Sequence, residues 1–442
     1  MVRKVTLWNL AIPLFIELLL FQLLGMVDTL VLSRVSDEAA GAVGACNQII
    51  GFTNLVFNII CIGANVLVSQ FIGANDRESA QKTMVCSYIM ITAAGVIGSL
   101  VLLLLGRAIL VLMGVTSGLL GHAVTYMRIV GGMMFLQAIL NLSTVLMRTH
   151  GFAKETLGIT AGMNILNVFG DILLVFGFNM GTAGAAYATS FSRFFAMLMA
   201  FRFVRKNILG NGAFRHVREF PAPIIKDLLR IGLPSAFENI CYNVSQIVIS
   251  GIILYNLGET AYITRTYTQQ IIFTFTTLAT SIGQANQMII GRDVGAGRFD
   301  EAYNTCLRNF KMALLITLGY STVFFFFGKY FVRIFTGDPE ILELSALIMM
   351  ADAFLEPGRT FNLVLINGLK GSGDAVFPVI IGIISMWSIS AFGSWVLGVG
   401  AGLGLLGIWI AMALDEWARG FIALHRWHSR KWTSKAVVTR EA

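Results

Sequence analysis

Charged side chains are scarce in this sequence. Asp, Glu, Lys and Arg make up 13% of the 442 residues, against roughly 25% in ordinary soluble domains. Hydrophobic residues make up 56%, and the mean hydropathy is +0.75. This balance excludes a soluble globular protein. Apolar runs of about 20 residues, separated by short polar breaks, instead predict helices that cross a membrane.

Cysteine and histidine are also few, with five of each. The cysteines have an odd total and no paired spacing, which excludes a disulfide framework, and the histidines have no metal-binding spacing. No glycine-rich loop matches a phosphate-binding motif, and no nucleophile stands with a general base. We therefore expect neither an enzyme nor a bound cofactor.

The sequence does contain a long series of apolar segments. They have the length of membrane-spanning helices and lack the alternation of barrel strands. We predict an all-α polytopic membrane protein of about twelve transmembrane helices. The predicted spans start near Leu7, Asn47, Met84, Ala123, Thr156, Ala183, Leu228, Tyr262, Asn309, Ile341, Val376 and Gly404.

Basic residues give the chain a net charge of +8. They concentrate in every second loop, in a series that includes Arg148, Lys370 and Arg419 and is densest between Arg202 and Arg230. By the positive-inside rule, both termini are cytoplasmic. We therefore expect a multi-pass protein of a bacterial plasma membrane that contacts membrane lipids and binds no nucleic acid.

The chain contains an internal duplication. PLFIELLLFQ from Pro13 corresponds to PSAFENICYN from Pro234, and LMRTHG ending at Gly151 corresponds to LKGSG ending at Gly373. The duplication predicts an N-terminal six-helix bundle at 1–205, a cytoplasmic linker at 206–227 and a C-terminal six-helix bundle with a cytoplasmic tail at 228–442. Because each copy has an even number of spans, the bundles are expected to be parallel repeats with a cavity between them.

One apolar segment carries unusual polar residues. In GMNILNVFGDILLVFG, which spans 162–177, Asn164, Asn167 and Asp171 are spaced to share one face of a helix. A carboxylate at the bilayer centre costs roughly 2.5 to 3.5 kcal/mol and requires a partner, an ion or a water-filled cavity. The segment therefore predicts an ion site. Weak hydrogen bonding between helices is the structural alternative.

Several motifs, taken in order, resemble the multidrug and toxic compound extrusion (MATE) family. They are PLFIELLLFQLLGMVDTLVLS, SQFIGA, LMRTHGFAKE, NVFGDILLVFG and GTAGAAYATS, with GLPSAFEN and LKGSGDAVFP as second-half echoes. The resemblance covers nearly the whole chain. It implies a V-shaped pair of six-helix bundles that exports organic cations in exchange for Na⁺ or H⁺.

The resemblance also implies a coupling site in the first bundle. Its residues are Asp28, Asp171, Asn167 and Thr189, and Asn141 is a further candidate ligand. Two carboxylates with amide and hydroxyl oxygens suit a hard cation such as Na⁺. The same two carboxylates, if close together, would hold a shared proton. Both coupling ions therefore stay open.

A second group of charged residues lies in or beside other predicted spans. Glu17 and Glu238 occupy equivalent repeat positions, and each either stays at the helix end or attracts a cationic substrate. Asp352, Glu356 and Arg359 are spaced to share one helix face, which favours an internal ion pair over a secondary coupling role.

Intramembrane arginines point to a different substrate. Arg128, Arg193 and Arg265 fall within the predicted spans, and a positively lined cavity would favour an anion or a lipid phosphate. We expect acids such as Asp352 and Glu356 to neutralise Arg265 and Arg359 locally.

The sequence as a whole favours a secondary active antiporter that works as a monomer by alternating access. Its expected substrate is a small, cationic and amphipathic molecule. A lipid-linked oligosaccharide flippase of the same larger group is the alternative, and a membrane enzyme is a weaker one.

Overall fold

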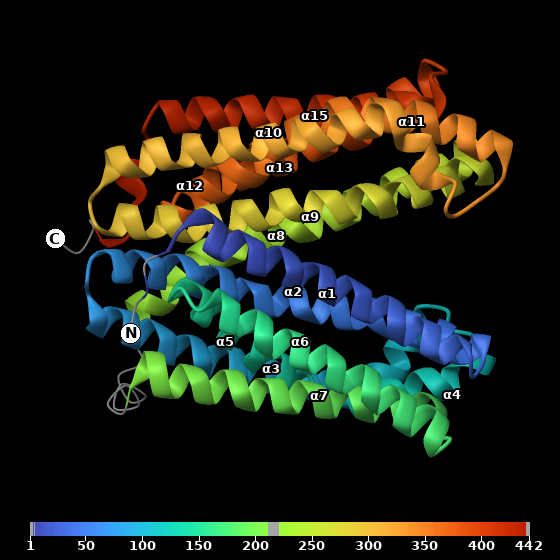
Figure 1. The fold of residues 1–442 in the computed structure, drawn as a ribbon, viewed down its shortest axis with the longest axis horizontal. Coiled ribbons are helices and arrows are strands. Elements are labelled where there is room, and N and C mark those ends of the chain that lie inside the picture. The colour runs from blue at the N-terminus through green and yellow to red at the C-terminus, as the bar shows by residue number, and fades with distance from the viewer. Residues whose placement is uncertain (1–2, 4, 211–220, 439–442) are drawn as a thin grey trace. The chain divides into compact units, whose positions relative to one another are not determined.

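The structure, a computed structural model, describes residues 3, 5–210 and 221–438, apart from the side chains of residues 26 and 28–30. Every regular element within these ranges is a helix (Figure 1). The predicted all-α fold class is therefore confirmed. Residues 211–220 of the predicted linker lie outside the described part of the chain.

Helices of membrane-spanning length run through the chain. Seven are apolar enough to cross a membrane, and a pair bent by 48°, Ser117–Gly131 with Met134–Thr149, raises the number to eight. Other long helices carry buried polar or charged residues, which lower their hydropathy. These residues, described below, make those spans harder to recognise by composition alone.

The chain divides into two compact units. The first consists of Met1–Val5, Ile12–Val68 and Asp76–Gly232, and the second of Thr6–Ala11, Ser69–Asn75 and Leu233–Ala442. Most of the first unit is formed by α1 (Leu7–Ser33), α2 (Asp37–Gly73), α3 (Arg77–Leu112), α4 (Ser117–Tyr126), η1 (Met127–Gly131), α5 (Met134–Thr149), α6 (Ala153–Asp171), η2 (Ile172–Gly177), α7 (Gly181–Val204) and η3 (Arg205–Leu209).

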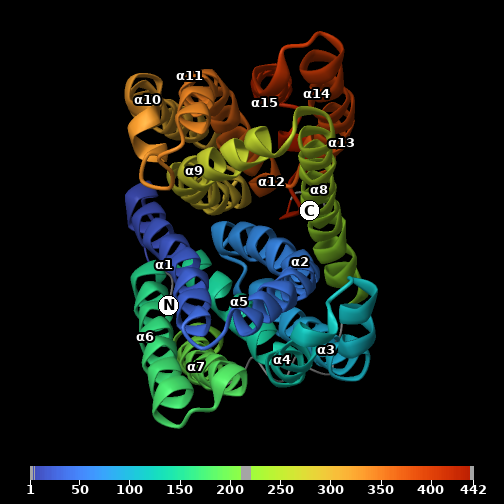
Figure 2. The ribbon, with the colours of Figure 1, turned by 90° about the vertical axis from the view of Figure 1, so that its right-hand side faces the viewer.

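The second unit is built from a similar series of helices. They are α8 (Ala222–Leu257), α9 (Glu259–Gly295), α10 (Phe299–Val332), α11 (Pro339–Phe361), η5 (Asn362–Ile366), α12 (Asn367–Gly371), α13 (Val376–Ser385), η6 (Met386–Ala391), α14 (Phe392–Ser394), η7 (Trp395–Gly400), α15 (Gly404–His428) and η8 (Thr433–Lys435). Within this unit, α11 packs between α10 and α15 (Figures 1 and 2).

The helices begin at or before the predicted span starts. The agreement is complete at Leu7, Val376 and Gly404. By contrast, α2 begins at Asp37 and α10 at Phe299, each well before the predicted apolar span. Polar first turns extend these helices beyond their apolar windows, since acidic residues near a helix N-terminus are favourable.

Capping residues fix two of the helix starts. The Asp76 carboxylate accepts a hydrogen bond from the backbone N–H of Ser79 at 3.0 Å, one turn into α3. Asp338 does the same for Glu340 at 2.9 Å, and Pro339 occupies the first helical position of α11. Both arrangements satisfy N–H groups that a helix leaves unpaired at its start.

The two halves of the repeat share a turn that requires glycine. Gly151 and Gly373 have φ values of +87° and +94°, in the left-handed region where a side chain would be strained. Each follows a helix that ends in the repeated motif, α5 in one case and α12 in the other. The duplicated sequence thus forms the same backbone turn twice.

The segment after α15 folds back onto the second unit. Trp432 stacks on Trp427 with ring centroids 4.3 Å apart. Further on, the backbone N–H of Val437 donates to Gln70 Oε1 at 2.9 Å, and Gln70 Nε2 donates to the carbonyl of Gly371 at 2.9 Å. The end of α2 and the C-terminal segment are therefore joined by one amide side chain.

Close packing at Gly283 yields a test of the fold. A Cβ atom on Gly283 of α9 would lie 2.2 Å from the carbonyl oxygen of Leu363, whereas a Cβ on Gly319 of α10 would meet nothing within 4 Å. We expect Gly283→Ala to lower the unfolding free energy by about 1 to 3 kcal/mol, the usual cost of overpacking. Gly319→Ala should be neutral or stabilising. Thermal unfolding in detergent would measure both, and equal melting temperatures would contradict the packing.

Candidate functional site

The polar residues predicted on α6 are buried in the first unit. Asn167 and Asp171 have no exposed surface, and Thr189 of α7 is 3% exposed. Asn167 Nδ2 donates a hydrogen bond to Thr189 Oγ1 at 3.3 Å. One turn earlier, Asn164 Nδ2 donates to the carbonyl of Leu20 in α1 at 3.0 Å. The amides therefore connect α6 to both α1 and α7.

Asp171 lies where the helix changes its form. It is the last residue of α6, and the π-helical segment η2 follows at once with Ile172. Single π turns inside α-helices frequently occur at functional sites, because the wider turn shifts side chains and backbone groups out of the regular register. The carboxylate thus stands one turn after Asn167, at the start of this irregular segment.

These three residues offer oxygen atoms to a cation. Because Nδ2 of Asn167 is used as a donor to Thr189, the amide oxygen is the group that would face a hard cation. The hydroxyl oxygen of Thr189 and the carboxylate of Asp171 add two further types of oxygen ligand. The set suits Na⁺ and also a proton carried by Asp171.

The other two predicted members of the site stand differently. Asp28 lies in α1, and its side chain falls outside the described residues. Asn141 of α5 donates to Asn54 Oδ1 of α2 at 3.3 Å and accepts from Gln137 Nε2 at 2.6 Å. The hydrogen bonds of Asn141 therefore tie α5 to α2. Its role as a cation ligand stays a prediction, as does that of Asp28.

Glu17 and Glu238 form the same ion pair in the two halves of the chain. Arg148 Nη1 lies 2.9 Å from Glu17 Oε1, and Lys370 Nζ lies 2.7 Å from Glu238 Oε2. The glutamates are 221 residues apart (238 − 17) and the basic residues 222 apart (370 − 148), the repeat offsets. Thr160 adds a hydrogen bond to Glu17 at 3.2 Å. In each copy, the pair joins the first helix to the end of the fourth.

This result changes the assignment of several basic residues. Arg148 and Lys370 were counted with the cytoplasmic loops, yet both lie in helices and have side chains that are only 13% exposed. Arg419 was also placed there, but it lies in α15 and its side chain is 7% exposed. The positive-inside pattern therefore rests on the remaining loop residues, and these three arginine and lysine side chains are structural partners of buried acids.

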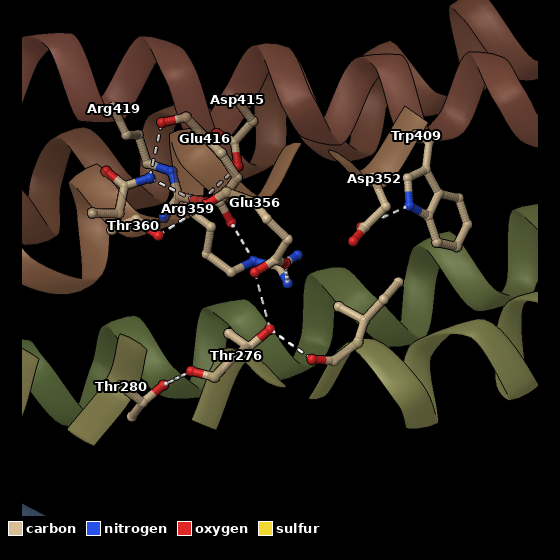
Figure 3. Close-up of polar contacts among 12 residues, drawn as sticks. Thr276, Thr280, Asp352, Glu356, Arg359, Thr360, Trp409, Asp415, Glu416 and Arg419 are labelled. Atoms are coloured by element: carbon tan, nitrogen blue, oxygen red, sulfur yellow. Dashed lines mark hydrogen bonds and ion pairs between the residues drawn. The ribbon is translucent and has the colours of Figure 1, made fainter. Parts of the chain in front are cut away.

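The second unit contains a larger network of buried charges (Figure 3). Glu356 and Arg359 of α11 form an ion pair, as their spacing predicted. Glu356 Oε2 also accepts from Tyr320 at 2.8 Å and from Thr276 at 3.1 Å. Every oxygen of Glu356 therefore has a donor, as a buried carboxylate requires.

Helix α15 supplies the other half of this network. Arg419 Nη2 lies 2.8 Å from Asp415 Oδ2 and 3.1 Å from Glu416 Oε2, and Arg359 Nε lies 3.5 Å from Glu416 Oε1 (Figure 3). Ser385 donates to Asp415 as well. The sequence interpretation missed Asp415 and Glu416. The signal was present, since LDEWAR places three charges within an otherwise apolar segment.

Asp352 stands apart from these ion pairs. Its Oδ1 accepts from Trp409 Nε1 at 3.1 Å, and Oδ2 has no hydrogen-bond donor among the described residues (Figure 3). The side chain belongs to a residue that is 1% exposed. The predicted common face of Asp352, Glu356 and Arg359 is thus divided, since Glu356 alone forms an ion pair with the arginine.

Arg265 is not neutralised as the sequence suggested. It is 3% exposed and donates to Gln246 Oε1 at 2.7 Å and to Ser250. Both partners are neutral, and within the described ranges no carboxylate forms an ion pair with it. The expectation that acids such as Asp352 pair with Arg265 is wrong, because those acids lie on α11 and are engaged elsewhere.

Long apolar helices with paired charges inside them define a polytopic membrane transport protein. The chain belongs to the MatE family, whose model matches residues 13–173 and 234–396. The two matched segments begin 221 residues apart (234 − 13), which is the offset found in the sequence. The predicted membership of the MATE transporter family is therefore confirmed.

Similar proteins cover nearly the whole chain. It is 36% identical to the uncharacterized transporter YisQ of Bacillus subtilis, over 98% of this chain and 96% of the relative. It is 29% identical to a probable multidrug resistance protein NorM of Thermotoga maritima, over 98% and 94%. Among solved structures, an outward-facing multidrug resistance MATE transporter has a TM-score of 0.88 at 20% identity, over 96% of this chain and 95% of that one. That structural likeness shows the fold.

The ion pair in the second unit can be tested by charge removal. Lys370→Ala leaves the Glu238 carboxylate, whose side chain is 11% exposed, without its partner. We expect a loss of about 3 kcal/mol in unfolding free energy, because an uncompensated buried charge is costly. The double variant Glu238→Lys with Lys370→Glu should recover much of that loss.

A surface pair provides the control. Lys82 and Glu78 have side chains that are 26% and 68% exposed, so Lys82→Ala should change the unfolding free energy by less than about 1 kcal/mol. Thermal unfolding would compare the three variants. Equal effects of Lys370→Ala and Lys82→Ala would show that the buried pair contributes no more than a surface one.

Proposed function

We propose that this protein is a secondary active antiporter that exports small organic cations in exchange for Na⁺ or H⁺. The observation that carries the proposal is the buried group of Asn167, Asp171 and Thr189 on α6 and α7. Relatives named as multidrug resistance proteins support efflux as the direction of transport. The proposed substrate is small and amphipathic and reaches the protein from the cytoplasm or from membrane lipids.

The coupling ion binds Asp171 in this proposal, with Asn167 and Thr189 as further ligands and Asp28 of α1 as a second carboxylate. Because Asn164 and Asn167 join α6 to α1 and α7, a cation at Asp171 would alter contacts among all three helices. Its binding would bias an equilibrium between outward-open and inward-open states. A cation that moves inward supplies about 2.3 kcal/mol per charge per 100 mV of membrane potential.

The remaining features of the proposal follow from the sequence. We place the boundaries of the two bundles at 1–205 and 228–442, with both termini and the linker in the cytoplasm of a bacterial cell. The protein works as a monomer, since one chain supplies every residue of the coupling site. It carries out transport without enzymatic chemistry and without a cofactor.

A flippase for lipid-linked oligosaccharides is the second candidate. It is favoured by the buried guanidinium of Arg265, whose partners Gln246 and Ser250 are neutral and would leave it attractive to a phosphate. The ion pairs of Arg359 and Arg419 with acids weigh against it, because these arginines are already neutralised.

The first functional prediction concerns Asp171 and Thr189. Asp171→Asn should fold and insert but reduce ion-driven efflux at least tenfold, since the amide keeps the size and loses the charge. Thr189→Val removes the hydroxyl that accepts from Asn167, whereas Thr189→Ser keeps it. We expect the valine variant to be impaired and the serine variant to be active. Efflux from proteoliposomes under separately imposed sodium and pH gradients would measure this, and wild-type coupling by Asp171→Asn would refute the site.

Orientation is tested by labelling from outside the cell. In a variant without its five native cysteines, Thr116→Cys should react with an impermeant thiol reagent in intact cells. Asn75→Cys should react only after the membrane is opened. Both positions are exposed in turns at opposite ends of α3. Labelling in the reverse order would place the termini outside.

The exporter and the flippase differ in what Arg359 does. The double variant Arg359→Met with Glu356→Gln removes both charges and keeps an oxygen for the donors Tyr320 and Thr276. An exporter should retain efflux of a purely cationic dye, while a flippase that grips a phosphate should lose its activity. Dye efflux, lipid flipping and thermal unfolding would be measured together. A stable variant without dye efflux, combined with lipid flipping by the wild type, would favour the flippase.

A further inference from the structure

The second unit contains a pocket of its own, lined by charges of both signs. Arg359 of α11 and the acids Asp415 and Glu416 of α15 form one part of its wall. The opposite part comes from α8, with Ser245 and Gln246. The coupling group around Asp171 lies in the other unit, so this pocket is a separate feature.

The ion pair at the pocket wall is the longest in its network. Arg359 Nε and Glu416 Oε1 are 3.5 Å apart, whereas Arg419 lies 2.8 Å from Asp415 and 3.1 Å from Glu416. Arg359 has the most exposed side chain of these residues, at 20%. The contact between Arg359 and Glu416 is therefore the one that a ligand could open at the lowest cost.

Neutral groups of α8 complete the polar wall. Ser245 is 1% exposed, and its hydroxyl has no hydrogen-bond partner among the described residues. Gln246 uses its amide oxygen to accept from Arg265, so its amide nitrogen is the group left to act as a donor. A buried hydroxyl without a partner is costly in a protein interior, and a polar ligand would satisfy it.

We propose that this pocket binds an amphoteric head group, in which an ammonium and a carboxylate are carried by neighbouring atoms as in an α-amino acid. The carboxylate meets Arg359 and the hydroxyl of Ser245, and the ammonium meets Glu416. Met386 and Met412, which also line the pocket, offer a flexible apolar surface to the rest of the molecule. This ligand is a substrate if the proposed function holds.

Charge balance favours a head group with both signs. A simple cation that takes Glu416 leaves Arg359 with one partner fewer, and a simple anion that takes Arg359 does the same to Glu416. Removing one partner of a buried pair is expensive. A ligand with adjacent opposite charges replaces both halves of the opened contact, and its charge spacing matches the 3.5 Å between the two side chains.

Three matched probes test this proposal with the purified full chain. L-phenylalanine carries both charges, its methyl ester keeps only the ammonium, and N-acetyl-L-phenylalanine keeps only the carboxylate. Titration calorimetry should show L-phenylalanine binding at least tenfold more tightly than either derivative. Equal or tighter binding of the ester would show a simple cation site, and equal or tighter binding of the acetyl compound an anion site. Either result overturns the proposal, as does no binding by L-phenylalanine.

Two serine variants locate the bound ligand. Ser245→Ala removes the unpartnered hydroxyl of the pocket and leaves the ion pairs intact, and it should weaken L-phenylalanine binding several-fold. Ser321 of α10 is also buried with an unpartnered hydroxyl in the described chain but does not line the pocket. Ser321→Ala should therefore leave affinity unchanged. Equal effects of the two variants would place the ligand elsewhere and overturn the proposal.

A charge variant separates the two polar ends. Glu416→Gln should remove the preference for L-phenylalanine over its acetyl derivative, because the ammonium has lost its partner. Binding is measured without any ion gradient, so it is independent of coupling. Binding without coupled efflux would sustain this inference and refute the antiporter, whereas efflux of simple cations without amphoteric binding would do the reverse.

Discussion

Charges inside a bilayer require partners, and this requirement organises the second unit. Three carboxylates, on Glu356, Asp415 and Glu416, are held against two guanidinium groups, on Arg359 and Arg419. The pairs link α11 to α15, which also pack directly against each other. Removing any one group would leave another without compensation, so the side chains are mutually dependent and the two helices are tied together by them.

The two halves of the chain solve a common problem with the same residues and then diverge. Each half fixes its first helix to the end of its fourth with a glutamate and a basic residue, and each ends that motif with a glycine in the left-handed region. The first half places its other polar groups on α6 and α7, as amides, a hydroxyl and Asp171. The second half places them on α11 and α15 as ion pairs. One fold thus contains a site suited to a small cation and another suited to larger polar groups.

The sequence predicted the fold class, the family and most helix positions, because hydropathy and the repeat are properties of the chain itself. It also predicted the pairing of Glu356 with Arg359, since a helix brings residues three apart together. It did not predict that Arg148 and Lys370 are partners of Glu17 and Glu238, because those contacts join helices more than 130 residues apart in the chain. For the same reason Arg265 was given the wrong partners. Periodicity within one helix says which residues share a face, but it does not say which other helix covers that face.

The contacts of Gln70 also bear on how the protein is made. Its amide oxygen accepts from the backbone of Val437, which follows it by 367 residues. At the usual synthesis rate of about 5 to 20 residues per second, roughly 20 to 70 s separate the appearance of the two residues. During that interval the end of α2 has already left the ribosome while its partner does not yet exist. The biogenesis of the second unit is thus obligatorily late, and an early helix waits for a late segment before its last buried amide is satisfied.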